Sequence, residues 1–147
     1  MTHWYRKGFT LVEMVIVVLI VAILLTLMLP SYQRQLMHTR RSLAAAALRE
    51  AMMRQEQYFL EHKRFAAALT DLGYPAHPYA IDPQGNAVTD QVDDRIYLIG
   101  LATRDNAYEL FAMPQLGQAA DRLCGTLSLD SAGRKSATGK GALRDCW

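Results

Sequence analysis

One uninterrupted apolar run near the N-terminus constrains this chain more than any other feature. Residues 9–29 (FTLVEMVIVVLIVAILLTLML) contain a single charged side chain, that of Glu13. As an α-helix the run would be about 31 Å long at about 1.5 Å per residue, which is enough to cross a bilayer core. It is too long for the apolar region of a cleaved secretory signal, and no A-x-A-like cleavage site follows it. The sequence therefore predicts a membrane-spanning helix.

The net charge of the chain belongs to the short leader before this run. The sequence has 16 Lys and Arg against 14 Asp and Glu, and the first eight residues hold Arg6 and Lys7 but no acid. These two cations favour a cytoplasmic N-terminus. The rest of the chain is neutral, which argues against a dedicated polybasic nucleic-acid binder. A hydrophobic content of 51% also excludes an intrinsically disordered chain.

Two residues distinguish the segment from an ordinary signal anchor. Gly8 separates the charged leader from the apolar run, and Glu13 lies inside the run. An ionised carboxylate in hydrocarbon costs several kcal/mol unless it is paired or near the surface, so an acid there suggests a function. The alternative is a plain anchor with an acid near its end.

The stretch RKGFTLVEMVIVVLIVAIL closely resembles the prepilin signature of type IV pilins and of type II secretion pseudopilins. In that family a prepilin peptidase of the inner membrane cuts after the glycine and N-methylates the new terminal residue. The resemblance implies cleavage between Gly8 and Phe9, methylation of Phe9, and pairing of Glu13 with the terminal amine of a neighbouring subunit. Such an amine is largely cationic at neutral pH, and a pair at ~4 Å gains about 4 kcal/mol at an effective dielectric of ~20.

Pro30 ends the apolar run. Because proline lacks an N–H and clashes with the preceding turn, we expect a kink or break of the helix near Thr26. Similar pilins have a proline here, and the segment before it can lose helical structure in the filament. Many of them also have a glycine at the position of Ala22. The alternative is a simple kink at the membrane surface.

Residues 31–62 predict a long amphipathic helix. Leu48, Met52 and Phe59 fall at helical spacing, with Ala44 and Ala51 beside them. We expect a sheet to cover this apolar face; as a coiled-coil seam it is irregular. The charged side is expected to comprise Arg34, Arg41, Arg49, Glu50, Arg54, Glu61 and Lys63.

The remainder predicts a loop followed by an antiparallel meander. Residues 73–94 are rich in proline and contain the turn DPQGN, and we expect a connector there. Strands are predicted at residues 95–103, 107–113 and 124–129, with a short fourth strand at 134–137. The fold class is therefore α+β, a long helix with a three- to four-stranded sheet. The resemblance implies a type IV pilin fold, with a leader (1–8), an apolar helix (9–30) and a head with its amphipathic helix (31–147).

The two cysteines lie near the C-terminus. In a domain outside the cytoplasm Cys124 and Cys146 would usually oxidise, and the closed loop would contribute about 3 kcal/mol on the chain-entropy model. The alternative is a pair of buried free thiols. Pilin heads end in a disulfide-bounded loop, and CGTLSLDSAG followed by a terminal DCW resembles a group of minor type IV pilins.

The sequence contains no catalytic or metal-binding motif. Its histidines are scattered, and its acidic loop residues lack the repeated oxygen-ligand spacing of an EF-hand, so we expect no enzyme, metal or cofactor. Four cations cluster between the cysteines: Arg134, Lys135, Lys140 and Arg144. They form either a patch for DNA phosphates, with strongly salt-dependent binding, or a solvated loop at the pilus surface.

The resemblance implies a structural function. We expect a minor pilin that enters the inner membrane with its head in the periplasm and then joins an extracellular filament. Its partners would be other pilins, the prepilin peptidase, the inner-membrane assembly platform and, before assembly, lipid. The resemblance implies roles in pilus biogenesis, twitching motility, adhesion or DNA uptake. The alternatives are a DNA receptor for natural transformation and a type II secretion pseudopilin, although major pseudopilins typically have a calcium loop in place of the disulfide.

Overall fold

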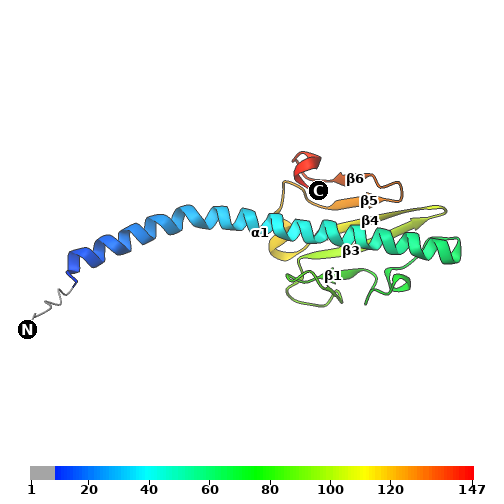
Figure 1. Ribbon diagram of the computed structural model, residues 1–147, viewed down its shortest axis with the longest axis horizontal. Helices are drawn as coiled ribbons and strands as arrows, with labels where there is room; N and C mark the ends of the chain where they lie inside the picture. Colours follow the sequence, from blue (N-terminus) through cyan, green and yellow to red (C-terminus); the bar gives the residue numbers. More distant parts are fainter. Residues whose placement is uncertain (1–8) are drawn as a thin grey trace, which may run out of the picture. The chain divides into compact units, whose positions relative to one another are not determined.

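A computed structural model of the chain describes residues 9–147; the leader, including Gly8 of the expected cleavage site, lies outside the described residues. A long helix, α1 (Leu11–His62), is followed by a six-stranded sheet and three short 3-10 helices (Figure 1). The chain forms two compact units, Met1–Leu36 and Met37–Trp147. We call the described part of the first unit the N-terminal segment and the second unit the head.

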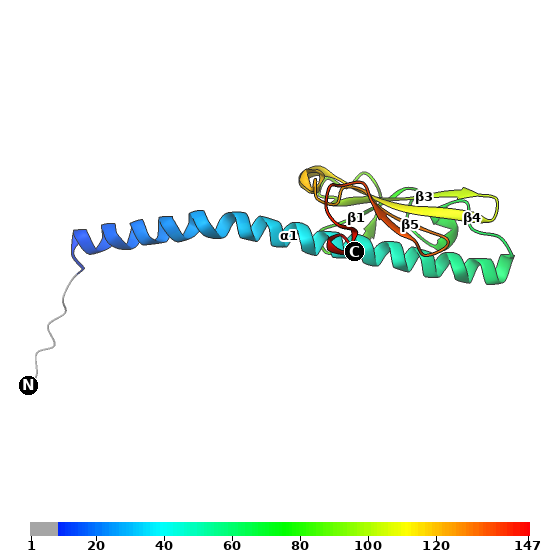
Figure 2. The same ribbon diagram turned by 90° about the horizontal axis from the view of Figure 1, so that it is seen from above.

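The sheet of the head is antiparallel throughout, in the order β2-β1-β3-β4-β5-β6. The head portion of α1 lies along one face of this sheet (Figures 1 and 2). The strands are β1 (Tyr79–Ile81), β2 (Ala87–Val88), β3 (Tyr97–Arg104), β4 (Ala107–Pro114), β5 (Leu127–Asp130) and β6 (Lys135–Ala137). The 3-10 helices are η1 (Leu69–Leu72), η2 (Leu116–Ala120) and η3 (Leu143–Asp145).

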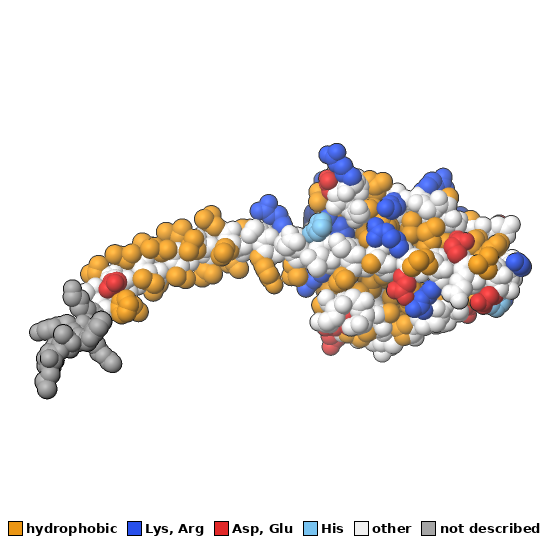
Figure 3. Space-filling view, viewed as in Figure 1, with side chains coloured by type: hydrophobic (Ala, Val, Ile, Leu, Met, Phe, Trp, Pro, Cys, Tyr) orange, Lys and Arg blue, Asp and Glu red, His pale blue; other side chains and the backbone are white. Residues whose placement is uncertain are grey.

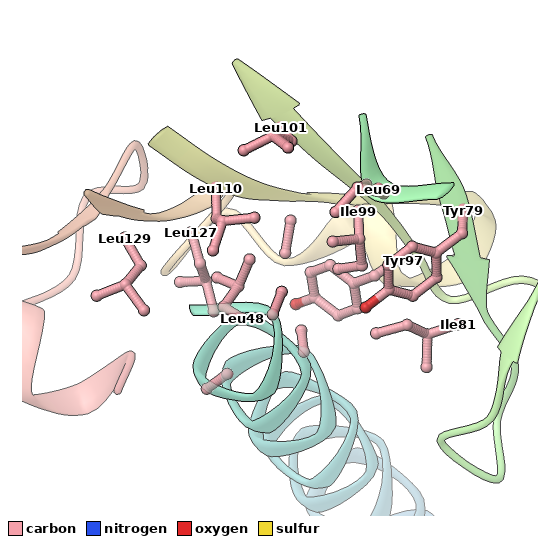
Figure 4. Close-up of a cluster of buried hydrophobic side chains, with 14 of the residues drawn as sticks. Leu48, Leu69, Tyr79, Ile81, Tyr97, Ile99, Leu101, Leu110, Leu127 and Leu129 are labelled. Atoms are coloured by element: carbon pink, nitrogen blue, oxygen red, sulfur yellow. The ribbon is translucent and has the colours of Figure 1, made fainter. Parts of the chain in front are cut away.

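The core of the head lies between α1 and the sheet (Figure 4). Ala44, Leu48 and Ala51 are fully buried, as the helical spacing predicts. The small alanines let the helix approach the sheet closely, and alternate residues of β3 and β4, such as Ile99 and Leu110, point toward Leu48. Burial of one large apolar side chain contributes about 1.5–3 kcal/mol, so this face fixes the helix to the sheet.

The four predicted strands are all present, and two further strands were not predicted. Residues 79–81 and 87–88, which we assigned to a connector, form β1 and β2. The DPQGN turn joins them: the Asp82 carboxylate accepts hydrogen bonds from the backbone N–H groups of Gln84 and Asn86. Both strands are too short to show the alternation of apolar and polar residues that predicts a strand. The prolines of residues 73–94 therefore led us to expect a connector there.

The structure corrects the predicted position of Arg41 in α1, and it leaves the predicted loss of helical structure before Pro30 untested. Arg41, which we placed on the charged side, is 6% exposed and lies in the interior of the head. No interruption occurs at Pro30, because α1 continues through it and the turns on both sides keep their helical conformation. Loss of helical structure before Pro30 in a filament therefore stays a prediction.

The N-terminal segment has no core of its own. Its large apolar side chains are about half exposed or more, from 80% at Leu11 to 47% at Val17. Figure 3 shows these hydrophobic side chains covering the segment, with one acidic side chain near its start. Since exposed apolar surface of this extent is unfavourable in water, the segment requires an apolar environment.

Candidate functional site: the start of α1 and the C-terminal loop

The start of α1 presents Glu13 in its first turn. Thr10 caps the helix, because its hydroxyl oxygen accepts a hydrogen bond from the backbone N–H of Glu13 at 3.2 Å. Thr10 and Glu13 have the S/T-x-x-E spacing of a capping box, a signal that our sequence analysis missed. The Glu13 side chain is exposed and makes no ion pair with the residues that the structure describes.

The apolar part of α1 is long and apolar enough to cross a membrane. None of that stretch is buried within the structure. The single carboxylate of Glu13 therefore lies close to one end of a segment whose other side chains are uncharged and mostly apolar.

The C-terminal loop is closed by a disulfide between Cys124 and Cys146, with a Cα–Cα distance of 5.5 Å. Both cysteines are buried. The two free thiols that the sequence left open as an alternative are therefore not what the structure shows. The bond encloses the β5–β6 hairpin and η3 and attaches the end of the chain to the head.

Arg41 links the helix to this loop. Its guanidinium donates two hydrogen bonds to one Asp121 carboxylate oxygen, at 3.0 and 2.8 Å, and a third to the carbonyl oxygen of Asp145 at 2.9 Å. The other Asp121 oxygen accepts a hydrogen bond from the backbone N–H of Cys124 at 3.3 Å. A buried ion pair of this kind is costly to break, since removal of either partner leaves an uncompensated charge.

Gln118 of η2 extends the same polar network. Its side-chain amide donates to the carbonyl oxygen of Met37 and to the hydroxyl of Tyr97, both at 3.2 Å. Burial raises the pKa of Tyr97, so the hydroxyl stays protonated at neutral pH. The start of the head helix, η2 and the disulfide are thus held together by one set of buried polar contacts.

The four cations of the loop do not form a single cluster. Arg134 pairs with Asp130 at 2.6 Å in the β5–β6 turn. Arg144 lies 3.7 Å from Asp145 in η3. The backbone N–H of Lys140 bonds to the carbonyl oxygen of Arg122, so Lys140 belongs to the segment beside the disulfide. β6 separates the Arg134 turn from Lys140 and Arg144.

Lys135 has a partner that the sequence did not reveal. Its ammonium lies 5.4 Å from the centre of the Trp147 ring, and the guanidinium of Arg49 lies 5.8 Å from the same ring. The indole N–H of Trp147 donates to the carbonyl oxygen of Ser136 and fixes the ring. Arg49 comes from α1, so only the fold brings both exposed cations to this aromatic ring.

The sequence of the head decides the family. Residues 30–128, about two thirds of the chain, match the family described as "Type IV minor pilin ComP, DNA uptake sequence receptor". The chain belongs to this family of type IV minor pilins. Residues 5–29 match the prokaryotic N-terminal methylation motif, so the two matches together run without a gap from the leader to β5.

The fold of this minor pilin agrees with the match. A type IV pilin from Shewanella oneidensis is similar in structure, with a TM-score of 0.50 and 20% identity, over 76% of this chain and 97% of that one. At this identity the likeness shows the fold alone. The search of individual curated proteins gave no match.

Membership in the family defines the general function. The minor pilin is a structural subunit of a type IV pilus, from a family whose members assemble with other pilins and whose methylation motif implies processing by a prepilin peptidase. Its apolar helix and motif indicate a membrane-anchored precursor. The family match ends before β6, so it includes Arg49 but not the four cations of the C-terminal loop.

Proposed function

We propose that the minor pilin is held in the inner membrane by residues 9–30, with residues 31–147 in the periplasm, until it joins the filament through the assembly platform. Cleavage between Gly8 and Phe9 and methylation of Phe9 precede that step. The observation that carries the proposal is the exposed apolar surface of the N-terminal segment, which adjoins a matched methylation motif. This role is structural, and we assign the chain no catalytic step.

Glu13 is proposed to set the axial position of the subunit. Its carboxylate is exposed at the start of an apolar helix, and the amine of Phe9 in a neighbouring processed subunit is the complementary charge. In the low dielectric of packed apolar helices, an unpaired Glu13 is strongly unfavourable, so only registers that supply a cation are stable.

The test compares Glu13→Val with the control Glu61→Val, which removes an exposed acid from the other end of α1. We expect both variants to insert into membranes and only Glu13→Val to be depleted, at least tenfold, from sheared filaments. Incorporation of Glu13→Val at the wild-type level would remove the pairing role.

A second function, DNA binding by the head, is favoured by one specific observation. Two exposed cations, Arg49 and Lys135, lie within 5.8 Å of the centre of the Trp147 ring, and the matched family is described as a DNA uptake sequence receptor. Two cations beside an aromatic ring can hold a phosphate backbone while the ring contacts a sugar or base. We propose this surface, rather than the whole C-terminal loop, as the DNA contact.

Binding of the head (residues 37–147) to duplex DNA, measured as a function of salt, tests this assignment. The pair Arg49→Gln and Lys135→Gln should lower the slope of log affinity against log salt by about 2, because each cation displaces about one counterion. The matched pair Lys140→Gln and Arg144→Gln should leave that slope unchanged. The opposite pattern, or no binding by the unmodified head, would exclude this surface.

A further inference from the structure

The end of the head where the chain continues from the apolar run carries exposed leucines and cations together. Leu116, Leu123 and Leu143 are 55%, 49% and 46% exposed. They lie on η2, on the segment before Cys124 and on η3. Figure 1 shows the gold η2 segment and the red C-terminal turn at the end of the head nearest the α1 label, opposite the β3–β4 turn.

Hydrogen bonds fix η2 and η3 to the first turns of the head helix and the Leu123 segment to Gly141. Gln118 of η2 bonds to the carbonyl oxygen of Met37, and Arg41 bonds to the carbonyl oxygen of Asp145 in η3. The backbone N–H of Gly141 bonds to the carbonyl oxygen of Leu123 at 2.7 Å. The leucines therefore belong to one rigid end of the head and not to a flexible loop.

The charge at this end is predominantly positive. Arg122, Lys140 and Arg144 are exposed, and the backbone contact between Lys140 and Arg122 brings those two residues together. Of the acids nearby, Asp121 is buried against Arg41, which leaves Asp145 as the exposed carboxylate beside Arg144. Apolar side chains interspersed with more cations than acids are typical of surfaces that rest on anionic lipid.

The length of the chain places this end near the membrane. Seven residues separate the end of the apolar run from Met37, all within α1. As helix they rise by about 10 Å, close to the roughly 5–8 Å of headgroup layer on each side of a bilayer. Lipid headgroups are thus within reach of side chains at the Met37 end of the head.

We propose that Leu116, Leu123 and Leu143, with Arg122, Lys140 and Arg144, form a surface that contacts anionic phospholipid headgroups before the pilin enters the filament. The proposal rests on the membrane-anchored precursor of the proposed function and adds a second contact with the bilayer, made by the head. It assigns Lys140 and Arg144 to lipid, whereas Arg49 and Lys135 remain assigned to DNA.

The test uses the full chain in nanodiscs of phosphatidylcholine alone, or of phosphatidylcholine with about one third phosphatidylglycerol. Amide hydrogen exchange is measured by mass spectrometry. We expect the peptides over residues 115–125 and 138–147 to exchange about tenfold more slowly in the anionic discs. Peptides over β3 and β4 should exchange equally in both lipids, which also shows that the head is folded.

A triple substitution, Arg122→Gln, Lys140→Gln and Arg144→Gln, should abolish the lipid-dependent difference. The matched control replaces Lys63, Arg64 and Arg104 with Gln at the opposite end of the head, where the Thr103 hydroxyl bonds to the carbonyl oxygen of Ala66. This control should retain the full difference.

Equal exchange in the two lipids, or a difference that survives the triple substitution, would overturn the proposal and leave the anchoring intact. Protection of these peptides that appears only when duplex DNA is added would assign the surface to nucleic acid instead. A chain that fails to co-purify with the discs would overturn the anchored precursor, and with it this proposal. The three failures are distinguishable because insertion, lipid dependence and DNA dependence are read separately.

Discussion

The two halves of α1 belong to one helix, but apolar side chains are exposed in the first half and buried in the second. In the N-terminal segment Leu24 is 52% exposed, and none of the apolar stretch is buried among the residues that the structure describes. In the head Leu48 is fully buried under the sheet, with Ala44 and Ala51 beside it. The comparison shows that helix formation is common to both halves, whereas the partner that stabilises each half differs.

The difference explains how one chain can be both a stable fold and an assembly unit. The head contains its own hydrophobic core, disulfide and buried ion pair, so the contacts that stabilise its fold lie within the head itself. The apolar side chains of the N-terminal segment are exposed and gain no such stabilisation among the described residues. Substitutions should therefore change the stability of the head or the incorporation into the filament, depending on the half in which they fall.

The largest effect should come from the buried ion pair of the head. Asp121→Ala leaves the Arg41 guanidinium buried without its counter-charge, and we expect a loss of about 3–5 kcal/mol in the free energy of unfolding, measured by urea denaturation. The double variant Arg41→Met and Asp121→Leu should recover most of this loss, because no unpaired charge remains. A cost under 1 kcal/mol for Asp121→Ala would show that water reaches the pair.

Leucine-to-alanine substitutions test the comparison directly. Leu48→Ala removes a fully buried side chain, and we expect the head to lose about 3 kcal/mol of stability. Leu24→Ala, in the exposed half of the same helix, should change it by less than about 0.5 kcal/mol. The free energy of unfolding of the head is measured in the detergent-solubilised full chain. A similar decrease for both variants would contradict the difference between the two halves of the helix.

The disulfide should contribute slightly less than the ion pair to the head. Replacement of both Cys124 and Cys146 by Ser opens the C-terminal loop, and we expect a cost of about 3 kcal/mol on the chain-entropy model. The measurement is urea denaturation of the oxidised head against the variant. Because the N-terminal segment has no such bond, insertion of the variant into membranes should be unchanged. A defect in insertion would show that membrane insertion depends on the fold of the head.

The smallest effect concerns a surface turn. Hydrogen bonds from the backbone and side chain of Arg134 lower the pKa of Asp130 in the β5–β6 turn. A carboxyl whose pKa is lower in the folded state stabilises the fold above its unfolded pKa of about 4, and that stabilisation is lost as the pH falls through the folded pKa. The deficit of Asp130→Asn relative to wild type should therefore shrink as the pH falls below about 4. A pH-independent deficit would contradict the ionic contribution.

The sequence predicted the elements whose signal is a local hydrophobic period or a local composition. The apolar run, the amphipathic face around Leu48 and the four strands of the meander each have a local pattern, and each is present in the structure. The short strands β1 and β2 have too few residues to show a pattern.

Arg41 was misplaced for a different reason. Arginine on a helix is usually solvated, and its partner Asp121 is 80 residues away in the sequence. Arg49 and Trp147 meet for the same tertiary reason, so no sequence motif could have indicated that two cations lie beside the ring. Thr10 differs from these, since its spacing from Glu13 was visible in the sequence.

The most direct test of the account is the intact mass and N-terminal sequence of the protein from native membranes or sheared filaments. We predict a chain that starts at N-methylated Phe9 and is two hydrogens short because Cys124 and Cys146 are bonded. A chain that keeps residues 1–8 in the presence of an active prepilin peptidase would contradict it. The N-terminal segment would then be a plain membrane anchor, and the assembly role of Glu13 would fall with it.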